Sequence, residues 1–352
     1  MTTKLEDAIA FAESHESTWD RDAGGKFGVH LNERSPWNRL YGPIHSRGPA
    51  SGVILHEGKE IAAWGEPDRA DLTYSVAKTY LALLAGVAHD RGLLPDVDER
   101  IGKRLPGIGF DDGNNARITW KHMLQQTSEW EGTLWDIPDQ ADRYRAVTFG
   151  PRPGGRKGDA RPLETPGGYW EYNDVRINAL ALALLHLFQQ PLPEVFGEAI
   201  MRPVGATEDW QWIGYDNAWI ALNGRRVQSV TGGSHWGGGV SISARNQARI
   251  GRMILDDGMA EGKRVLSAEW LHQMRQPCNI APYYGYLVWL NHERKIFPSL
   301  PTSSYFGIGA GQSFTWIEPE RHLVVIVRWL ESAYADDLFA QILSAIDAAP
   351  AN

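Results

Sequence analysis

Strand-forming patterns lie near both ends of this 352-residue chain, and a long stretch of helical patterns separates them. The strand candidates are residues 52–56, 60–64, 286–290, 313–317 and 322–329. The turn Glu57-Gly58-Lys59 indicates a β-hairpin between the first two, and residues 318–321 indicate another between the last two. Strands at both ends with helices between them predict an α+β fold, in which the two ends build one antiparallel sheet.

Helical patterns flank and interrupt this sheet. Amphipathic segments at residues 4–18 and 338–346 predict helices that pack on it, as in an α/β/α sandwich. We expect residues 1–92 and 215–352 to form the sheet domain, residues 93–214 to be an inserted, mostly helical domain, and the active site to lie in the cleft between them. Local patterns predict helices over 76–89, 120–126 and 175–188, the last capped by Asp174, and a surface loop over 150–168.

Charge and composition argue against several classes of function. The formal net charge of −8 at pH 7 disfavours a nucleic-acid or anionic-membrane surface. The first residues lack the apolar segment of a secretory signal, and no apolar run reaches transmembrane length, so we expect a cytoplasmic protein. The single cysteine, Cys278, cannot form an intrachain disulfide, and we expect it to be a small semi-buried side chain.

The tetrapeptide Ser75-Val76-Ala77-Lys78 begins a long apolar helical segment. Residues three apart lie on the same face of a helix, so the Ser75 hydroxyl and the Lys78 amine would be within hydrogen-bonding reach. An amine held neutral can take the proton of a hydroxyl and make it a nucleophile. The N–H of Ser75, at the positive end of the helix, could also hold an oxyanion. The alternative interpretation is a helix-capping serine and a solvated lysine.

Two later segments carry groups that a nucleophilic serine needs. Tyr172 lies just before the helix at 175–188, where its phenol could shuttle a proton between the serine and a leaving group. The glycine-rich segment 305–312 precedes a strand, and its glycines would let the N–H of Gly309 approach the serine as a second oxyanion donor. The alternatives are a buried tyrosine with a satisfied hydroxyl and a flexible turn.

These motifs, in this order, resemble the serine β-lactamase-like, penicillin-recognising superfamily, which includes class C β-lactamases, D,D-peptidases, family VIII esterases and 6-aminohexanoate-dimer hydrolases. Ser75 and Lys78 match its S-x-x-K motif, Tyr172 to Asp174 its Y-x-N motif, and Gly307-Ile308-Gly309 the position of K-T-G or H-x-G. Segments 118–128, 202–206 and 238–246 also match family motifs. The resemblance implies a β-lactamase-like fold and a hydrolase that cleaves a small ester or amide through an acyl-enzyme on Ser75.

Two departures from the family pattern bear on substrate and mechanism. The lysine of K-T-G, which helps penicillin-binding members hold the substrate carboxylate, is missing, and this disfavours β-lactams. Asp174 replaces the usual asparagine, and a carboxylate near Lys78 would favour the ammonium form. We therefore expect Tyr172 to move protons in acylation, with Lys78 charged or sharing the proton.

The remaining candidates would support the site rather than carry its chemistry. His235 and Trp236 lie beside glycines and could contact substrate, with a purely structural role as the alternative. Other supporting or pocket-lining candidates are Asp174, Ile308, Trp130, Trp135 and Trp170. The sequence contains no H-E-x-x-H, no paired cysteines and no G-x-S-x-G, so we expect no metal, no cofactor and no α/β-hydrolase. An acyltransferase, a non-catalytic binding protein and a weak β-lactamase are the rival hypotheses.

Overall fold

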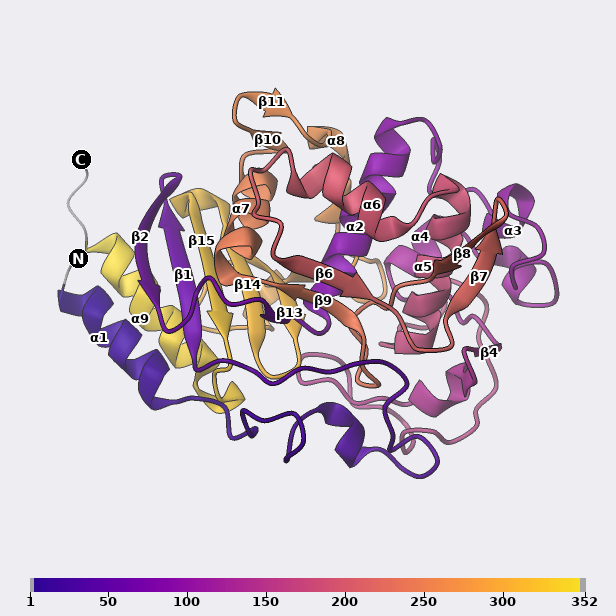
Figure 1. The fold of residues 1–352 in the computed structure, drawn as a ribbon, viewed down its shortest axis with the longest axis horizontal. Helices are drawn as coiled ribbons and strands as arrows, with labels where there is room; N and C mark the ends of the chain where they lie inside the picture. The colour runs from indigo at the N-terminus through magenta and orange to yellow at the C-terminus, as the bar shows by residue number, and fades with distance from the viewer. Residues whose placement is uncertain (1–2, 349–352) are drawn as a thin grey trace.

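The largest sheet is antiparallel and is built from both ends of the chain, as the sequence predicts (Figure 1). The computed structural model describes residues 3–348, and within them the strand order is β12-β13-β14-β15-β1-β2. These strands are Ser51–His56 (β1), Lys59–Trp64 (β2), Trp289–Leu290 (β12), Tyr305–Gly309 (β13), Ser313–Glu318 (β14) and Leu323–Arg328 (β15). The two ends of the chain meet where β1 pairs with β15, from Ser51 opposite Arg328 to His56 opposite Leu323.

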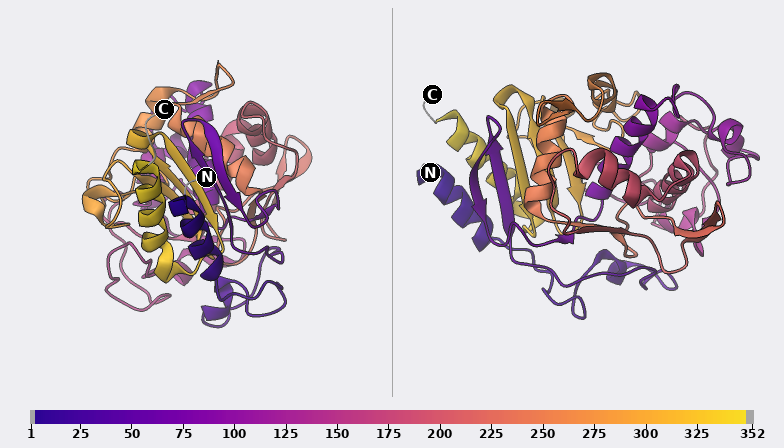
Figure 2. Two further views of the ribbon diagram at one scale, coloured as in Figure 1. Left: turned by 90° about the vertical axis from the view of Figure 1, so that its left-hand side faces the viewer. Right: turned by 45° about the horizontal axis from the view of Figure 1, so that its top comes forward.

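Helices cover both faces of this sheet. The terminal helices α1 (Thr3–Ser14) and α9 (Ala335–Asp347) pack side by side over one face (Figure 2). Helix α7 (Ala244–Leu255) lies against β1, β14 and β15 on the other face. Gly251 allows this close packing, because an added Cβ there would lie 2.7 Å from the Val324 side chain. The arrangement is the predicted α/β/α sandwich.

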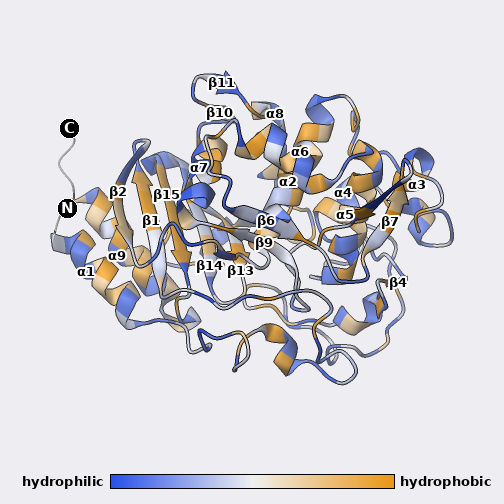
Figure 3. Ribbon diagram, viewed as in Figure 1, coloured by the Kyte–Doolittle hydropathy of each residue, from blue (hydrophilic) through white to orange (hydrophobic). Residues whose placement is uncertain are grey.

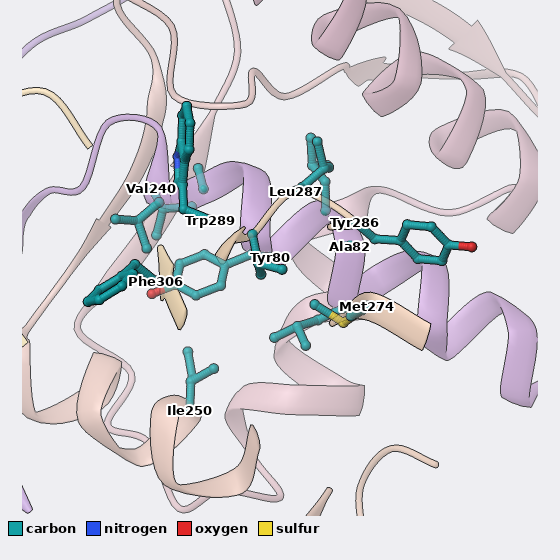
Figure 4. Close-up of a cluster of buried hydrophobic side chains, with 14 of the residues drawn as sticks. Tyr80, Ala82, Val240, Ile250, Met274, Tyr286, Leu287, Trp289 and Phe306 are labelled. Carbon is teal, nitrogen blue, oxygen red and sulfur yellow. The ribbon is translucent and has the colours of Figure 1, made fainter. Parts of the chain in front are cut away.

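Helix α2 (Val76–Asp90) joins the sheet to the helical region. It contacts β13, α5 (Asp174–Phe188) and α8 (Ala268–Met274), and almost all of its residues are buried because apolar side chains occupy every face. Figure 4 shows Tyr80 of α2 gathered with Ile250, Met274 and Phe306, which come from α7, α8 and β13. This packing holds the start of α2 against β13.

Short elements and long loops make up the rest of the described chain. The short helices are α3 (Ile101–Arg104), α4 (Trp120–Leu124) and α6 (Leu192–Phe196), and a second sheet joins β3 (Asp71–Leu72), β9 (Gly239–Ile242) and β6 (Trp210–Ile213). The hairpins are β4 (Thr133–Leu134) with β5 (Ile137–Pro138), β7 (Trp219–Leu222) with β8 (Arg225–Gln228), and β10 (Met259–Ala260) with β11 (Lys263–Arg264). Hydrophobic residues fill the strands of the main sheet and also helices α2 and α5 (Figure 3). Among residues 3–348, no helix combines the length and the apolar character that a bilayer-spanning segment needs.

Three local predictions need correction. Asn173, rather than Asp174, caps α5, because the Asn173 side chain accepts hydrogen bonds from two N–H groups of the first turn. Only the last two residues of segment 286–290 form a strand, since Leu287 has a left-handed φ of 53° that interrupts the extended backbone. The glycine-rich segment 305–312 does precede a strand, β14, but its first five residues also form a strand, β13.

Candidate active site

Ser75 lies immediately before α2 and faces Lys78. Although Ser75 occupies the N-cap position, its side chain makes no capping hydrogen bond. Its Oγ instead accepts a hydrogen bond from Lys78 Nζ at 2.8 Å. The preceding residue, Tyr74, has a left-handed φ of 47°, a conformation that costs energy in a non-glycine residue and persists only where the surrounding structure enforces it. The local backbone therefore presents the serine to the lysine rather than to the helix end.

Lys78 is buried, and three oxygen atoms surround its Nζ. These are Asp174 Oδ1 at 2.7 Å, Ser75 Oγ at 2.8 Å and the Gly232 carbonyl oxygen at 3.2 Å. The contact with Asp174 is a close ion pair, although its geometry is not that of an aligned hydrogen bond. Oxygen atoms on three sides suit an ammonium group, which has three donors and no acceptor.

Asp174, the first residue of α5, is also buried. Its Oδ2 lies 2.8 Å from His235 Nδ1 and 2.8 Å from the Arg145 guanidinium. Burial raises the pKa of Asp174, but the charges of Arg145 and Lys78 outweigh burial and hold that pKa well below its usual range. Asp174 is therefore a carboxylate that touches Lys78 on one oxygen and Arg145 and His235 on the other.

Further charges extend this network, and of these Asp142 is fully buried whereas Arg145, Lys157 and Glu33 are partly buried. Asp142 lies 3.2 Å from Arg145 and 3.0 Å from Lys157, and Lys157 also pairs with Glu33. Burial raises the pKa of Asp142, but Lys157 and Arg145 outweigh it and lower that pKa to about 2. The sequence analysis did not identify these four residues, because they lie on irregular segments where no periodicity or motif marks a side chain as buried.

Protein cations take the positions that a metal ion would need beside these carboxylates. Among the described residues, Asp142, Asp174 and His235 each bring one possible ligand atom to within 4.8 Å of the others. Arg145 contacts both carboxylates, and Lys157 and Lys78 contact one each. The cluster is therefore an ion-pair network between side chains.

Tyr172 lies in the extended segment before α5 and is placed beside the Ser75–Lys78 pair. Its ring stacks on Trp289, with ring centroids 5.6 Å apart and an interplanar angle of 23°. Lys78 Nζ and the Arg145 guanidinium each lie 5.0 Å from the centre of the Tyr172 ring. Tyr172 and Ser75 line the same cavity, so a bound molecule could contact both side chains.

Strand β13 passes very close to the start of α2. An added Cβ at Gly309 would lie 2.0 Å from the Thr73 carbonyl oxygen and 3.2 Å from the Ser75 nitrogen. No side chain fits in that space, so the close approach of the two backbones requires glycine. The approach puts the Gly309 backbone next to the Ser75 amide, which is the arrangement that a two-donor oxyanion hole needs.

A cavity of about 520 Å³ opens over Ser75. The polar residues that line it include Glu33, Arg145, Lys157 and Tyr172. The apolar residues that line it include Val29, Val147, Phe149, Trp289 and Ile308. Ile308 and Gly309, both singled out in the sequence, therefore reach the cavity together with Ser75.

The other predicted pocket residues lie outside this cavity wall. Trp130 donates its ring N–H to the Gly109 carbonyl, and Trp135 is packed at the hydrophobic core. Trp170 packs against Trp289, and Trp236 is fully buried with its ring N–H donated to the Trp37 carbonyl. Trp289, which the sequence analysis treated only as part of a strand, is the tryptophan that lines the cavity.

Comparisons with known proteins identify the family and the fold of this chain. The family described as "Beta-lactamase" matches residues 50–329. A 6-aminohexanoate-dimer hydrolase of Paenarthrobacter ureafaciens is 42% identical over 216 residues, which is 59% of this chain and 51% of that protein. The chain thus matches about half the length of this relative.

Two solved structures share the fold. A family VIII carboxylesterase superposes with a TM-score of 0.61 over 98% of this chain and 96% of its own, at 16% identity. A D-stereospecific amidohydrolase from Streptomyces sp. superposes with a TM-score of 0.56 over 86% of this chain and 94% of its own, at 17% identity. At these identities the likeness concerns the fold alone.

Proposed function

Because the chain belongs to the β-lactamase family, we propose that it is a serine hydrolase that cleaves a small ester or amide through an acyl-enzyme on Ser75. The observation that carries the proposal is the 2.8 Å contact between Ser75 Oγ and buried Lys78 Nζ, beside the strand that holds Gly309. The relative named as a 6-aminohexanoate-dimer hydrolase supports an amide substrate. The carboxylesterase structure contributes only the observation that this fold can carry ester hydrolysis.

In the proposed reaction, Ser75 Oγ forms a bond to the substrate carbonyl carbon. Its proton passes to the Lys78–Tyr172 pair, and the carbonyl oxygen becomes an oxyanion held by the N–H groups of Ser75 and Gly309. The intermediate then expels the alcohol or amine, which takes the proton from the same pair. Water attacks the acyl-enzyme, gives a proton to the pair, and releases the acid while Ser75 recovers its proton.

The residues that line the cavity favour a substrate whose acyl group is uncharged. Its cations Arg145 and Lys157 are already paired with Asp142, Asp174 and Glu33, so they are not free to bind a substrate carboxylate. The apolar side chains that line the cavity favour contact with hydrocarbon. The missing lysine of K-T-G agrees with this, and we expect little turnover of nitrocefin, a β-lactam.

The decisive test compares wild type with Ser75→Ala on short-chain p-nitrophenyl esters and with a fluorophosphonate probe. We expect Ser75→Ala to lose turnover and labelling, while Ser14→Ala, an exposed serine on α1, keeps both. Wild-type rates in Ser75→Ala would show that Ser75 is not the nucleophile. Diversion of the acyl-enzyme to added alcohols or amines would instead identify an acyltransferase, and the absence of any adduct by intact mass would favour a binding protein.

A further inference from the structure

His235 is a buried imidazole that the proposed reaction does not use. Its Nδ1 lies 2.8 Å from Asp174 Oδ2, and its backbone N–H donates to the same oxygen at 3.3 Å. Its Nε2 lies 3.2 Å from Lys157 Nζ. The ring therefore bridges the carboxylate that contacts Lys78 and a second lysine on the loop that lines the cavity.

The groups around the ring determine which of its nitrogens carries a proton. Charged or titratable groups face it from several segments: Asp174, Asp142, Arg145, Lys157, Glu33 and His30. Lys157 also contacts Glu33 and Asp142, so two carboxylates lie beside its Nζ in addition to the His235 ring. The Lys157 ammonium lies 3.2 Å from Nε2, and a proton on that nitrogen would place two donors face to face. Although Glu33 Oε1 also lies 3.4 Å from Nε2, we therefore infer that Nε2 carries no proton and that Nδ1–H donates to Asp174. Burial also lowers the pKa of His235, although Asp142 and Asp174 oppose that shift.

We propose that Lys157 locks His235 in its neutral Nδ1–H form, and that His235 is a positioning residue which sets how strongly Asp174 holds Lys78. This inference rests on the proposed function of Lys78 as a carrier of the Ser75 proton. The Oδ2 atom of Asp174 contacts the His235 ring and the Arg145 guanidinium, whereas its Oδ1 atom contacts Lys78 Nζ. Each donor on Oδ2 draws negative charge away from Oδ1 and loosens its hold on the lysine.

Loss of the His235 donor should therefore change the pH dependence of the reaction. With fewer donors on Oδ2, Asp174 binds the Lys78 ammonium more tightly, and the Ser75 proton is accepted only at higher pH. A charge-assisted hydrogen bond of the usual strength corresponds to a shift of about one pH unit in the acidic limb of kcat/KM. Activity near neutrality falls about tenfold and recovers at higher pH.

A matched pair of variants separates this role from simple packing. The side-chain amide of His235→Asn can put an N–H near the position of Nδ1, whereas that of His235→Gln reaches the position of Nε2. We expect His235→Asn to keep the wild-type acidic limb and His235→Gln to move it to higher pH, with both variants folded by circular dichroism. An equal loss at every pH in His235→Gln, with no movement of the limb, would overturn the proposal.

The tautomer is tested without any activity measurement. In 15N NMR of histidine-labelled protein, the signals lost in His235→Asn identify the ring. We expect wild-type His235 to carry a proton on Nδ1 alone between about pH 5 and pH 8, and Lys157→Met to let the ring gain a second proton in that range. A proton on Nε2 in wild type, or ordinary titration there, would refute the lock. Because this readout needs no turnover, its failure is distinct from the failure of Ser75→Ala to abolish activity.

Discussion

Gly309→Ala tests whether the close approach of β13 to Ser75 is needed for the reaction. The added methyl group would lie 2.0 Å from the Thr73 carbonyl oxygen and 3.2 Å from the Ser75 nitrogen. Non-bonded heavy atoms prefer separations of about 3.5 Å, so β13 must move away from α2 by more than about 1 Å. The atoms in the way belong to the backbone and cannot rotate aside as a flexible side chain could.

That movement would remove the Gly309 N–H from reach of the oxyanion. A misplacement of about 1 Å costs about a hundredfold in rate, and loss of one oxyanion donor costs about 10²–10³ in kcat. We therefore expect kcat to fall by about 10²–10³, which corresponds to about 3–4 kcal/mol, with a much smaller change in KM. The measurement is the kcat and KM of p-nitrophenyl ester hydrolysis, with a thermal melt to show that the variant is folded.

Gly307→Ala is the matched control on the same strand. Its added methyl group would lie 3.2 Å from the side chains of Thr79 and Val76, a tight contact that small side-chain movements can relieve. We expect its kcat to stay within about tenfold of wild type. If Gly309→Ala were as active as Gly307→Ala, the Gly309 N–H would not be an oxyanion donor and the argument from the backbone approach would be wrong.

Three further outcomes follow from other contacts. Arg176→Met removes a guanidinium that lies 2.8 Å from the buried carboxylate of Glu129. The free energy of unfolding in urea should therefore fall by about 3 kcal/mol, and an unchanged unfolding midpoint would contradict this. Trp289→Ala removes the cavity wall that stacks on Tyr172 and should lower kcat/KM about tenfold, with part of the loss regained on bulkier acyl esters. Burial raises the pKa of Asp142, but neighbouring cations outweigh it and lower that pKa to about 2. The Asp142 carboxylate therefore stabilises the fold fully above its ordinary pKa of 3.8, and this stabilisation is lost as the pH falls toward 2. Melting temperature should drop through that window in wild type and less steeply in Asp142→Asn.

The parts of the candidate site that the sequence identified are a pair of residues one helical turn apart and residues that lie in recognisable motifs. Ser75 and Lys78 are one helical turn apart, so their contact follows once α2 forms. Tyr172 and Asp174 stand at the start of α5, and their resemblance to a family motif identified them before any contact was known. The cytoplasmic location and the division into a sheet domain and an inserted domain stay predictions.

The groups that the sequence did not identify owe their roles to distant contacts. Three of these groups, Glu33, Arg145 and Lys157, lie on loops, and Asp142 ends a short 3-10 helix, so no periodic pattern marks them. Their contacts form only when these segments come together in the folded chain. The pocket tryptophans were wrongly placed for a similar reason, since burial of an indole ring does not reveal which wall it faces.

The amino-acid order by itself determined the two-ended antiparallel sheet, the helix that carries Ser75 and Lys78, and the motifs around Tyr172 and Gly309. Periodicity, turn chemistry and one-turn spacing act over a few residues, so they can be recognised in a linear chain. The family resemblance already placed the Asp174 carboxylate near Lys78. Only the tertiary structure decided that His235 contacts the other oxygen of that carboxylate, that Lys157 lies next to His235, and that the Gly309 backbone lies against the Thr73 carbonyl. These features depend on distances between segments far apart in the chain, and such distances are set by packing rather than by local sequence.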